Sequence, residues 1–498
     1  MTAATLDVRT AAPDVDLSGV ACSTTALQQL LTDAPTGSVV HIPAGATINL
    51  SDGPVTPNGA VTLDARGATI VDNGTTPAFA LGPDNSGSRF IGLHLQGDKG
   101  GRPYGNPMHR AFDCAGTPAV GADGDTDTAG WIRGLRFEDV SVDGFQSAGW
   151  WMQHCLDLAY RSCEVTNCGY AGFEHLSCWN VTIDDPHVER LYGKDANHYW
   201  QSYPIAFSRD QTEDDLARYP RSRWCDVRGG LIASTGWEGV ETHGGDHITV
   251  LGTRVHGCYH GIAAVPCPDS TGADIMGPTD INVLFCTVES GVSDGSLGSG
   301  IKLIGAGISG RRTEAATGRI IGNTVIGYGS GRTNTGANGD PSTVAAGVQL
   351  YQTDHVLIDD FRIIEPSPFG IALWYDNTSA RIGRGTISDP WHDTFANPAA
   401  VAIRSTGNSL ALGEITLAKG TKSAAHKNAA GLYVSSNANA VRWTAKPDFR
   451  AAKTSTLGGA GMSATDFDIP DLVDLPKLSD NPTVADISAW ATSAGLAR

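Results

Sequence analysis

The sequence has little charge and no long apolar segment. Charged residues make up 18% of its 498 residues, and it contains no run of about 18 apolar residues, the length that a membrane-spanning helix needs. Residues 1–19 also lack the basic and apolar regions of a secretion signal. We therefore predict no membrane span and no classical secretion signal.

Positive charge is scarcer than negative charge. Lys and Arg number 35 against 53 Asp and Glu, which gives a formal net charge of −18. Because phosphate binding needs a basic stripe, this balance excludes nucleic acid as an expected partner. It also favours a neutral glycan over a polyanionic glycan as a ligand.

Cysteine pairs with metal-site spacing are missing. The ten cysteines lie between Cys22 and Cys286, and none forms a CxxC motif. Structural zinc sites usually draw their ligands from such pairs. We therefore expect no metal site, and nothing in the sequence indicates a cofactor.

Glycine, in contrast, is abundant, with 61 residues, and a short phrase beginning with a small residue recurs along the chain. In the phrase, a small residue is followed by an apolar residue, any residue, and a second apolar residue. Its first residues are Gly149, Gly172, Pro204, Gly239, Gly261, Gly300, Gly347, Gly370, Ala400 and Gly431. The shortest spacings are 22 and 23 residues, and a second alternating strand follows most phrases. Short period-2 strands repeating at this distance predict an all-β solenoid of stacked coils.

Stacking the phrases predicts which side chains form the core. The second residues of the phrases form an inward column: Trp150, Phe173, Ile205, Val240, Ile262, Ile301, Val348, Ile371, Val401 and Leu432. Cys155, Cys178 and Cys267 each lie six residues after the glycine that begins their phrase. We expect these three to be buried thiols that pack as small apolar groups, rather than disulfides. His175 should also point inward.

Both ends of a solenoid need a cap, because open strand edges would otherwise pair with other chains. Residues 24–31 predict a short amphipathic helix, and residues 39–45 predict the first strand. Regular coils fade after about residue 445. We therefore divide the chain into an N-terminal arm (1–20), a β-helix (21–445) and a C-terminal tail or assembly segment (446–498) with a helix near 484–496.

The opening of the chain resembles a known superfamily. A short helix, an apolar strand and Ile42-Pro43-Ala44-Gly45 before the coils resemble the pectin-lyase-like superfamily, which implies a right-handed parallel β-helix. Bacteriophage tailspikes share this fold. The Ala/Gly/Thr/Asp-rich composition and the ending resemble minor tail proteins of phages that infect actinobacteria. This resemblance implies location in a virion and contact with host cell-surface polysaccharide and other phage tail proteins. Such proteins are often homotrimers, although no coiled-coil heptads are present here.

A second resemblance concerns residues 238–243. Glu238-Gly239-Val240-Glu241-Thr242-His243 is similar to the Tyr-Gly-x-Asp-Pro-His segment of mannuronan C5-epimerases. Glu241 stands where that family has its Asp, and His243 where it has its His. Glu238 replaces the Tyr, and His260 replaces a later Asp. Loss of the Tyr removes a proton donor of the epimerase reaction.

The third residues of the phrases point outward and supply candidate catalytic groups. Glu174 and Glu241 are two rungs apart, and rungs of a parallel sheet are about 4.8 Å apart. Their backbones should therefore lie about 10 Å apart, near the separation of an acid and a base that flank a glycosidic bond. His243 follows Glu241 on the same face. We predict Glu174, Glu241 and His243 as the catalytic set, against the alternative of an ordinary solvated surface.

Outward aromatic and polar residues would contact a glycan. The predicted glycan-binding residues are Trp151, Tyr199, Trp200, Lys302, Gln349, Tyr351 and Trp374. Aromatic faces stack on sugar rings. Two functions remain open: a phage tail protein that contacts host-envelope glycans, with or without cleaving them, and a free extracellular actinobacterial polysaccharide hydrolase, lyase or epimerase. The coils next to Glu241 present Ala206 and Ala263, and this sparse chemistry favours binding over catalysis.

Overall fold

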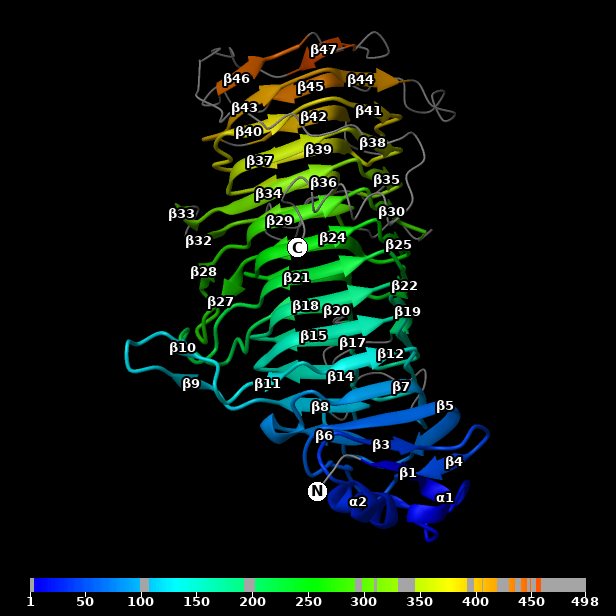
Figure 1. Cartoon of the computed structure of the whole chain (residues 1–498). Coiled ribbons are helices and arrows are strands. Elements are labelled where there is room, and N and C mark those ends of the chain that lie inside the picture. Colours follow the sequence, from blue (N-terminus) through cyan, green and yellow to red (C-terminus); the bar gives the residue numbers. More distant parts are fainter. Residues whose placement is uncertain are drawn as a thin grey trace. The chain divides into compact units, whose positions relative to one another are not determined.

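A computed structural model of the chain describes residues 4–98, 107–191, 202–291, 298–308, 311–329, 345–391, 398–404, 406–418, 430–434, 440–445, 448 and 454–457. The chain divides into two compact units, Met1–Trp237 and Glu238–Arg498. Each unit is built of coils that contribute three parallel strands, as the sequence predicted (Figure 1). No helix in the described ranges is long and apolar enough to cross a membrane.

The repeated phrases form one parallel sheet in each unit, here called the phrase sheet. In the first unit its strands are β6 (Phe79–Leu81), β8 (Phe112–Ala115), β14 (Ala148–Gln153), β17 (Ala171–Leu176) and β20 (Tyr203–Ser208). In the second unit they are β23 (Glu238–His243), β26 (His260–Val265), β31 (Ile301–Ile304), β36 (Ala346–Tyr351), β39 (Phe369–Trp374), β42 (Ala399–Ile403), β45 (Ala430–Val434) and β47 (Thr454–Leu457). Coils therefore continue past residue 445, where the sequence predicted a tail. The helix predicted near 484–496 lies outside the described residues.

Two further strand positions complete each coil of the first unit. The long strands β5 (Val61–Asp72) and β7 (Arg89–Gly97) each span both positions. In the later coils the second strands are β11 (Ile132–Arg133), β12 (Arg136–Glu138), β15 (Cys155–Arg161), β18 (Trp179–Asp184) and β21 (Arg223–Arg228). The third strands are β13 (Ser141–Asp143), β16 (Glu164–Thr166), β19 (His187–Leu191) and β22 (Leu231–Thr235). A short hairpin of β9 (Ala119–Val120) and β10 (Thr126–Asp127) and the 3-10 helix η1 (Pro83–Asn85) lie between strands.

The second unit repeats the arrangement. Its second strands are β24 (Asp246–Leu251), β29 (Thr279–Leu284), β34 (Ala316–Ile321), β37 (Thr353–Asp359), β40 (Ala380–Ile382), β43 (Ser409–Leu412) and β46 (Ala440–Trp443). Its third strands are β25 (Arg254–His256), β30 (Thr287–Glu289), β35 (Thr324–Ile326), β38 (Phe361–Ile364), β41 (Gly385–Ser388) and β44 (Ile415–Ala418). Two hairpins extend from the coils: β27 (Cys267–Pro268) with β28 (Asp274–Met276), and β32 (Ala306–Ile308) with β33 (Arg311–Glu314).

The N-terminal end of the first unit carries the predicted cap. Helix α2 (Thr24–Asp33) buries Leu27, Leu30 and Leu31, and is followed by β3 (Ser38–His41) and β4 (Thr47–Asn49). The segment predicted as a separate arm contains β1 (Thr5–Asp7), α1 (Val8–Ala11) and β2 (Ser18–Cys22). Because β1 pairs with β3 and β2 pairs with β4, this segment belongs to the first coil rather than standing apart.

The predicted inward column is confirmed. Its ten residues, from Trp150 to Leu432, are each at most 3% exposed. In the first unit the column extends towards the N-terminus beyond the first phrase. Phe79, Phe112, Trp150 and Phe173 stack in succession, with ring centroids 5.3, 5.5 and 4.6 Å apart. Aromatic side chains bury the most apolar area per residue and so dominate such a core. Cys155, Cys178 and Cys267 are fully buried free thiols, as predicted.

Close approach of neighbouring coils explains the small first residue of the phrase. A Cβ atom on Gly172 would lie 2.4 Å from the carbonyl oxygen of Pro204, and one on Gly261 would lie 2.4 Å from that of Gly300. The other phrase glycines from Gly149 to Gly370 meet the next coil's carbonyl in the same way, at under 3.0 Å. At these seven glycines a side chain would clash, whereas Pro204 and Ala400 hold the same position in two other phrases.

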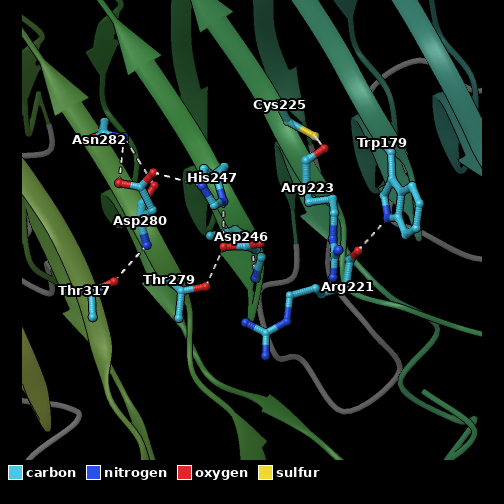
Figure 2. Close-up of polar contacts among 12 residues, drawn as sticks. Trp179, Arg221, Arg223, Cys225, Asp246, His247, Thr279, Asp280, Asn282 and Thr317 are labelled. Carbon is cyan, nitrogen blue, oxygen red and sulfur yellow. Dashed lines mark hydrogen bonds and ion pairs between the residues drawn. The ribbon is translucent and has the colours of Figure 1, made fainter. Parts of the chain in front are cut away.

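A column of residues with left-handed backbone runs along the second strands. In the first unit Asp157, Asn180 and Trp224 have φ of 59°, 57° and 56°, and in the second unit His247 and Asp280 have 55° and 49°. Figure 2 shows His247 beside Asp280, with its Nε2 atom 3.4 Å from Oδ2 of Asp280. The strand pairing skips these positions, so these coils bend at the same point.

Candidate active site

A cluster of ionisable side chains lies on the outer face of the phrase sheet in the second unit. It consists of Glu238, Glu241, His243, His260 and Lys302, here called the charge cluster. Strand register places Glu238 beside His260, and Glu241 beside Ala263, which pairs in turn with Lys302. The phrase residue Val240 points into the core, so its neighbour Glu241 points outward.

His243 and Glu241 form the contact at the centre of the cluster. The Nε2 atom of His243 lies 2.7 Å from Oε2 of Glu241. The side chain of Glu241 is 4% exposed and that of His243 is 22% exposed. His243 is therefore the member of the pair that solvent and a ligand can reach, and Glu241 lies behind it.

Glu238 and Lys302 form a second ion pair. The Nζ atom of Lys302 lies 3.0 Å from Oε1 of Glu238, and their side chains are 8% and 2% exposed. Burial alone would raise the pKa of Glu238, but the charge of Lys302, followed by that of the protonated His243, lowers it to about 2. Glu238 therefore stays a carboxylate at every pH at which the protein would work.

The pKa values of the two carboxyl groups in the cluster, Glu238 and Glu241, are shifted in opposite directions. Burial raises the pKa of Glu241 to about 7, although His243 opposes this shift, and the charge of nearby Glu238 adds to it. Burial would lower the pKa of His243, but the Glu241 carboxylate raises it to about 9. Pairs of groups whose surroundings separate their pKa values are typical of acid–base sites.

His260 is held neutral beside these charges. The backbone N–H of Ser299 donates to His260 Nδ1 at 2.9 Å, which leaves the proton of the neutral ring on Nε2. Burial, reinforced by Lys302, lowers the pKa of His260 to about 3. Ser299 Oγ donates to Oε1 of the buried Gln349 at 2.8 Å and accepts from the N–H of Ala346 at 3.2 Å. Ser299 thus links His260 to Gln349 and to the backbone of Ala346 beside the charge cluster.

The same residues include a set that could bind a cation. Ligand atoms of Glu238, Glu241 and His243 all lie within 4.8 Å of one another. Carboxylate and imidazole ligands suit several divalent metals. The ammonium group of Lys302 already neutralises Glu238, however, so a cation would have to displace it. The arrangement fits proton transfer better, because it holds a protonated imidazole and a carboxyl that titrates near neutral pH.

The outward columns are not an ordinary solvated surface. Glu174, Glu241, Lys302, Gln349 and Trp374 are each 6% exposed or less. These side chains point outward from their strands but are covered, so the alternative of an ordinary solvated surface is wrong for them. Lys302 and Gln349 contact members of the charge cluster or its supporting residues. In later coils the same face is apolar: Ala346, Phe369, Ala372, Trp374, Ala399, Ala402 and Ala430 form one buried cluster against which Tyr351 and Tyr433 pack.

The remaining predicted residues have separate outcomes. Trp151 is partly exposed on the first unit's phrase sheet, with the Arg110 guanidinium 3.9 Å above its ring. Glu174 belongs to the first unit and Glu241 to the second, so their action as a pair stays a prediction. Tyr199 and Trp200 lie outside the described residues. His175 is fully buried, as predicted, and contacts Tyr160 Oη at 3.1 Å.

The sequence reasoning missed Glu238, His260 and Ser299 as members of the site. All three precede their phrase glycine by one residue. In later coils this position holds Ala346, Phe369, Ala399 and Ala430, which pack with the outward residues Ala372 and Ala402. The residue before the glycine therefore lies on the outer face. A signal was present, because this position is ionisable in two successive phrases, Glu238 and His260.

Comparisons with known proteins support the fold. No protein-family model matches the sequence, and no curated protein sequence matches it. The catalytic domain of a GH87 alpha-1,3-glucanase in complex with nigerose matches with a TM-score of 0.51 at 10% identity, over 87% of this chain and 68% of that chain. A variant of that domain in complex with tetrasaccharides gives a TM-score of 0.52 with the same identity and coverage. The A-module of a mannuronan C-5 epimerase from Azotobacter vinelandii gives 0.47 at 12% identity, over 93% of this chain and 100% of that chain. The glucanase catalytic domain is a right-handed parallel β-helix, and the chain shares that fold.

Proposed function

We propose that this chain is a polysaccharide-processing protein that cleaves glycosidic bonds, with His243 and Glu241 as its acid–base pair. The observation that carries the proposal is the 2.7 Å contact between His243 Nε2 and Glu241 Oε2. It lies in the charged part of a sheet face that is apolar in the later coils. The structural likeness to an alpha-1,3-glucanase catalytic domain is consistent with a glycan substrate.

The exposures of the two side chains assign their roles. His243 is protonated at neutral pH, because its pKa is about 9, and it is the more exposed of the two. It would donate its proton to the oxygen of the leaving sugar as general acid. Once it has lost this proton, His243 would accept one from the attacking water, which restores the starting state. Glu241, buried behind it, would not touch the water but would hold the ring in place and stabilise its protonated form across the 2.7 Å contact.

Glu238 and Lys302 would act on this pair without touching the substrate, because they are buried. The fixed negative charge of Glu238 raises the pKa values of both Glu241 and His243. Lys302 keeps that charge stable in the protein interior. The predicted place in a phage tail and the virion location stay predictions, since a tail-bound depolymerase and a free enzyme would use the same site.

The test is product release from purified protein. Wild-type protein is incubated with alpha-1,3-glucan and with actinobacterial cell-wall polysaccharides, and reducing ends and unsaturated-sugar absorbance are both recorded. Hydrolysis releases reducing ends without that absorbance, whereas a lyase produces both. We expect Glu241→Gln and His243→Asn to lower the rate at least about 100-fold, the usual contribution of general acid–base catalysis.

His355→Asn is the matched control. His355 Nδ1 lies 3.0 Å from Asp354 Oδ1, and the His355 side chain is 52% exposed on a second strand of the same unit. This variant removes a histidine–carboxylate contact that lies outside the charge cluster, and we expect full activity. No product from wild type on any substrate, or equal rates in Glu241→Gln and wild type, would contradict the proposal.

A further inference from the structure

A pocket on the first unit carries chemistry that the charge cluster does not use. It opens on the second strands, β12, β15 and β18, and the segment before β12, and has a volume of about 300 Å³. Arg133, Arg136, Asp157, Asn180 and Thr182 supply its polar lining. We call it the arginine pocket. Its volume is at the lower end of the range for small-ligand sites, so it would hold a small group rather than a long polymer.

The two arginines make hydrogen bonds to neutral oxygen atoms rather than to carboxylates. Arg133 Nη2 donates to the carbonyl oxygen and the hydroxyl of Thr128, at 2.7 and 2.8 Å. Arg136 Nη1 donates to the backbone carbonyls of Leu135 and Asp157. In the part of the chain that the structure describes, neither guanidinium forms an ion pair with a carboxylate. By contrast, the neighbouring Arg89 pairs with Glu138 at 2.7 Å.

The one carboxylate in the lining is partly engaged from the next coil. Asn180 Nδ2 donates to Asp157 Oδ1, and both residues have left-handed backbone, so they stack directly from coil to coil. Two guanidinium groups against one carboxylate leave the lining with a net charge of +1. In a chain whose formal net charge is −18, such a pocket is a local exception to the overall sign.

We propose that the arginine pocket binds an anionic sugar unit of a polysaccharide. Arg133 and Arg136 would hold its carboxylate or phosphate group, because the guanidinium fork matches both anions and is weakly hydrated. The Asn180 amide and the Thr182 hydroxyl would hydrogen-bond the ring hydroxyls. The pocket belongs to the first unit, whereas the charge cluster belongs to the second. The inference goes beyond the proposed cleavage and does not depend on it.

Calorimetric titration of the full chain tests the inference. The probes are a β-1,4-linked glucuronic acid trisaccharide, its uncharged counterpart cellotriose, and a glycerol phosphate trimer. The first two differ only in the C6 carboxylates, so they isolate the anion. We expect at least one anionic probe to bind, at least about tenfold more tightly than cellotriose, and more weakly as salt is raised. Which anion binds better tells carboxylate from phosphate as the source of charge.

Variants assign the binding to the pocket. We expect Arg133→Gln to weaken binding of the anionic probe about tenfold, and Arg133→Gln with Arg136→Gln to abolish it. Arg133 is exposed and its contacts are local, so its variant should fold normally even if Arg136→Gln, which loses the Asp157 contact, does not. Arg66→Gln, at a 66% exposed arginine of the same unit, is the control and should bind like wild type.

The results separate this inference from the proposed cleavage. Glu241→Gln should bind the anionic probe as tightly as wild type even where its cleavage activity is lost. Affinities for both anionic probes no higher than that for cellotriose, no binding of either anion, or unchanged affinity in the folded Arg133→Gln variant would each overturn the inference.

Discussion

Lys302 on β31 reaches past the intervening strand β26 to Glu238 on β23, where Nζ lies 3.0 Å from Oε1. The two side chains are 8% and 2% exposed, so both charges lie away from bulk water. An ion pair in this setting depends on both partners, because either charge left alone in the interior is costly. The pair therefore ties three successive coils of the second unit together through one contact.

Removal of one partner of the ion pair should destabilise the fold much more than removal of both. We expect Lys302→Met to lower the free energy of unfolding by about 3–5 kcal/mol, because the Glu238 carboxylate stays buried without its partner. The double variant Glu238→Gln, Lys302→Met should lose clearly less. Urea unfolding of the three proteins measures this. Arg254→Met, at an exposed pair with Glu289, serves as the control and should change stability by about 1 kcal/mol or less. Equal losses in the single and double variants would refute the argument.

The ionisation of His243 should depend on Glu241. Proton release from His243, followed by NMR of the imidazole C–H signals in histidine-labelled protein, should have its midpoint near pH 9. Glu241→Gln removes the main charge that raises this pKa, so the midpoint should move to lower pH. A midpoint that stays where it is would show that the carboxylate does not act on the ring. His355, which contacts Asp354 at the surface, gives the reference signal in the same spectra.

Acid should destabilise the first unit through His175. Its ring is fully buried, and burial lowers its pKa to about 3, against an ordinary value of 6.5. Between pH 6.5 and about 3, His175 is therefore protonated in the unfolded chain but neutral in the folded protein. The stability contributed by the neutral ring is present above pH 6.5 and is lost as the pH falls towards 3, by about 1.4 kcal/mol per pH unit. His175→Gln should reduce the fall in unfolding free energy between pH 6.5 and 5. An unchanged slope in denaturant unfolding would contradict this.

Thiol chemistry should single out Cys22. It is the exposed cysteine of the ten, and the other nine are buried free thiols. Burial raises the pKa of Cys163, Cys168 and Cys286 to about 12, so these thiols are both shielded and protonated. Titration of the native protein with an aromatic disulfide reagent should release one equivalent quickly, and ten after denaturation. Cys22→Ser should remove the fast equivalent. Several fast thiols in that variant would mean that the coils open readily.

Repetition made most of the fold predictable. The phrase residues recur with alternating apolar positions, and a parallel sheet turns that alternation into a core column, so Trp150 and Leu432 could be assigned without a structure. The glycine of the phrase has a steric reason that depends on the neighbouring coil, but its recurrence was visible. Trp224 shows the limit, since a bulky residue with φ of 56° carries no turn signal.

The candidate site was only partly predictable. Glu241 and His243 were found because they stand two residues apart on an outward-facing strand. The burial of the Glu241 side chain was not predicted, because alternation reveals which face a side chain occupies but not what packs over that face. Glu238 was missed because its column begins before the alternating strand. Its partnership with Lys302 joins residues 64 positions apart in the sequence (302 − 238), and only the stacking of coils brings them together.

The line of glycines has a consequence for how such a chain can change in length. From Gly347 to Gly370 is one complete coil of 23 residues, and each of these glycines faces the carbonyl of the following coil. Deletion of one whole coil would set Gly300 against the carbonyl at position 370 instead of 347, and the line would remain unbroken. Deletion of half a coil would put a side chain on that line. The molecule is therefore a structure that can be shortened or extended only in whole steps, and the glycine marks where each step begins.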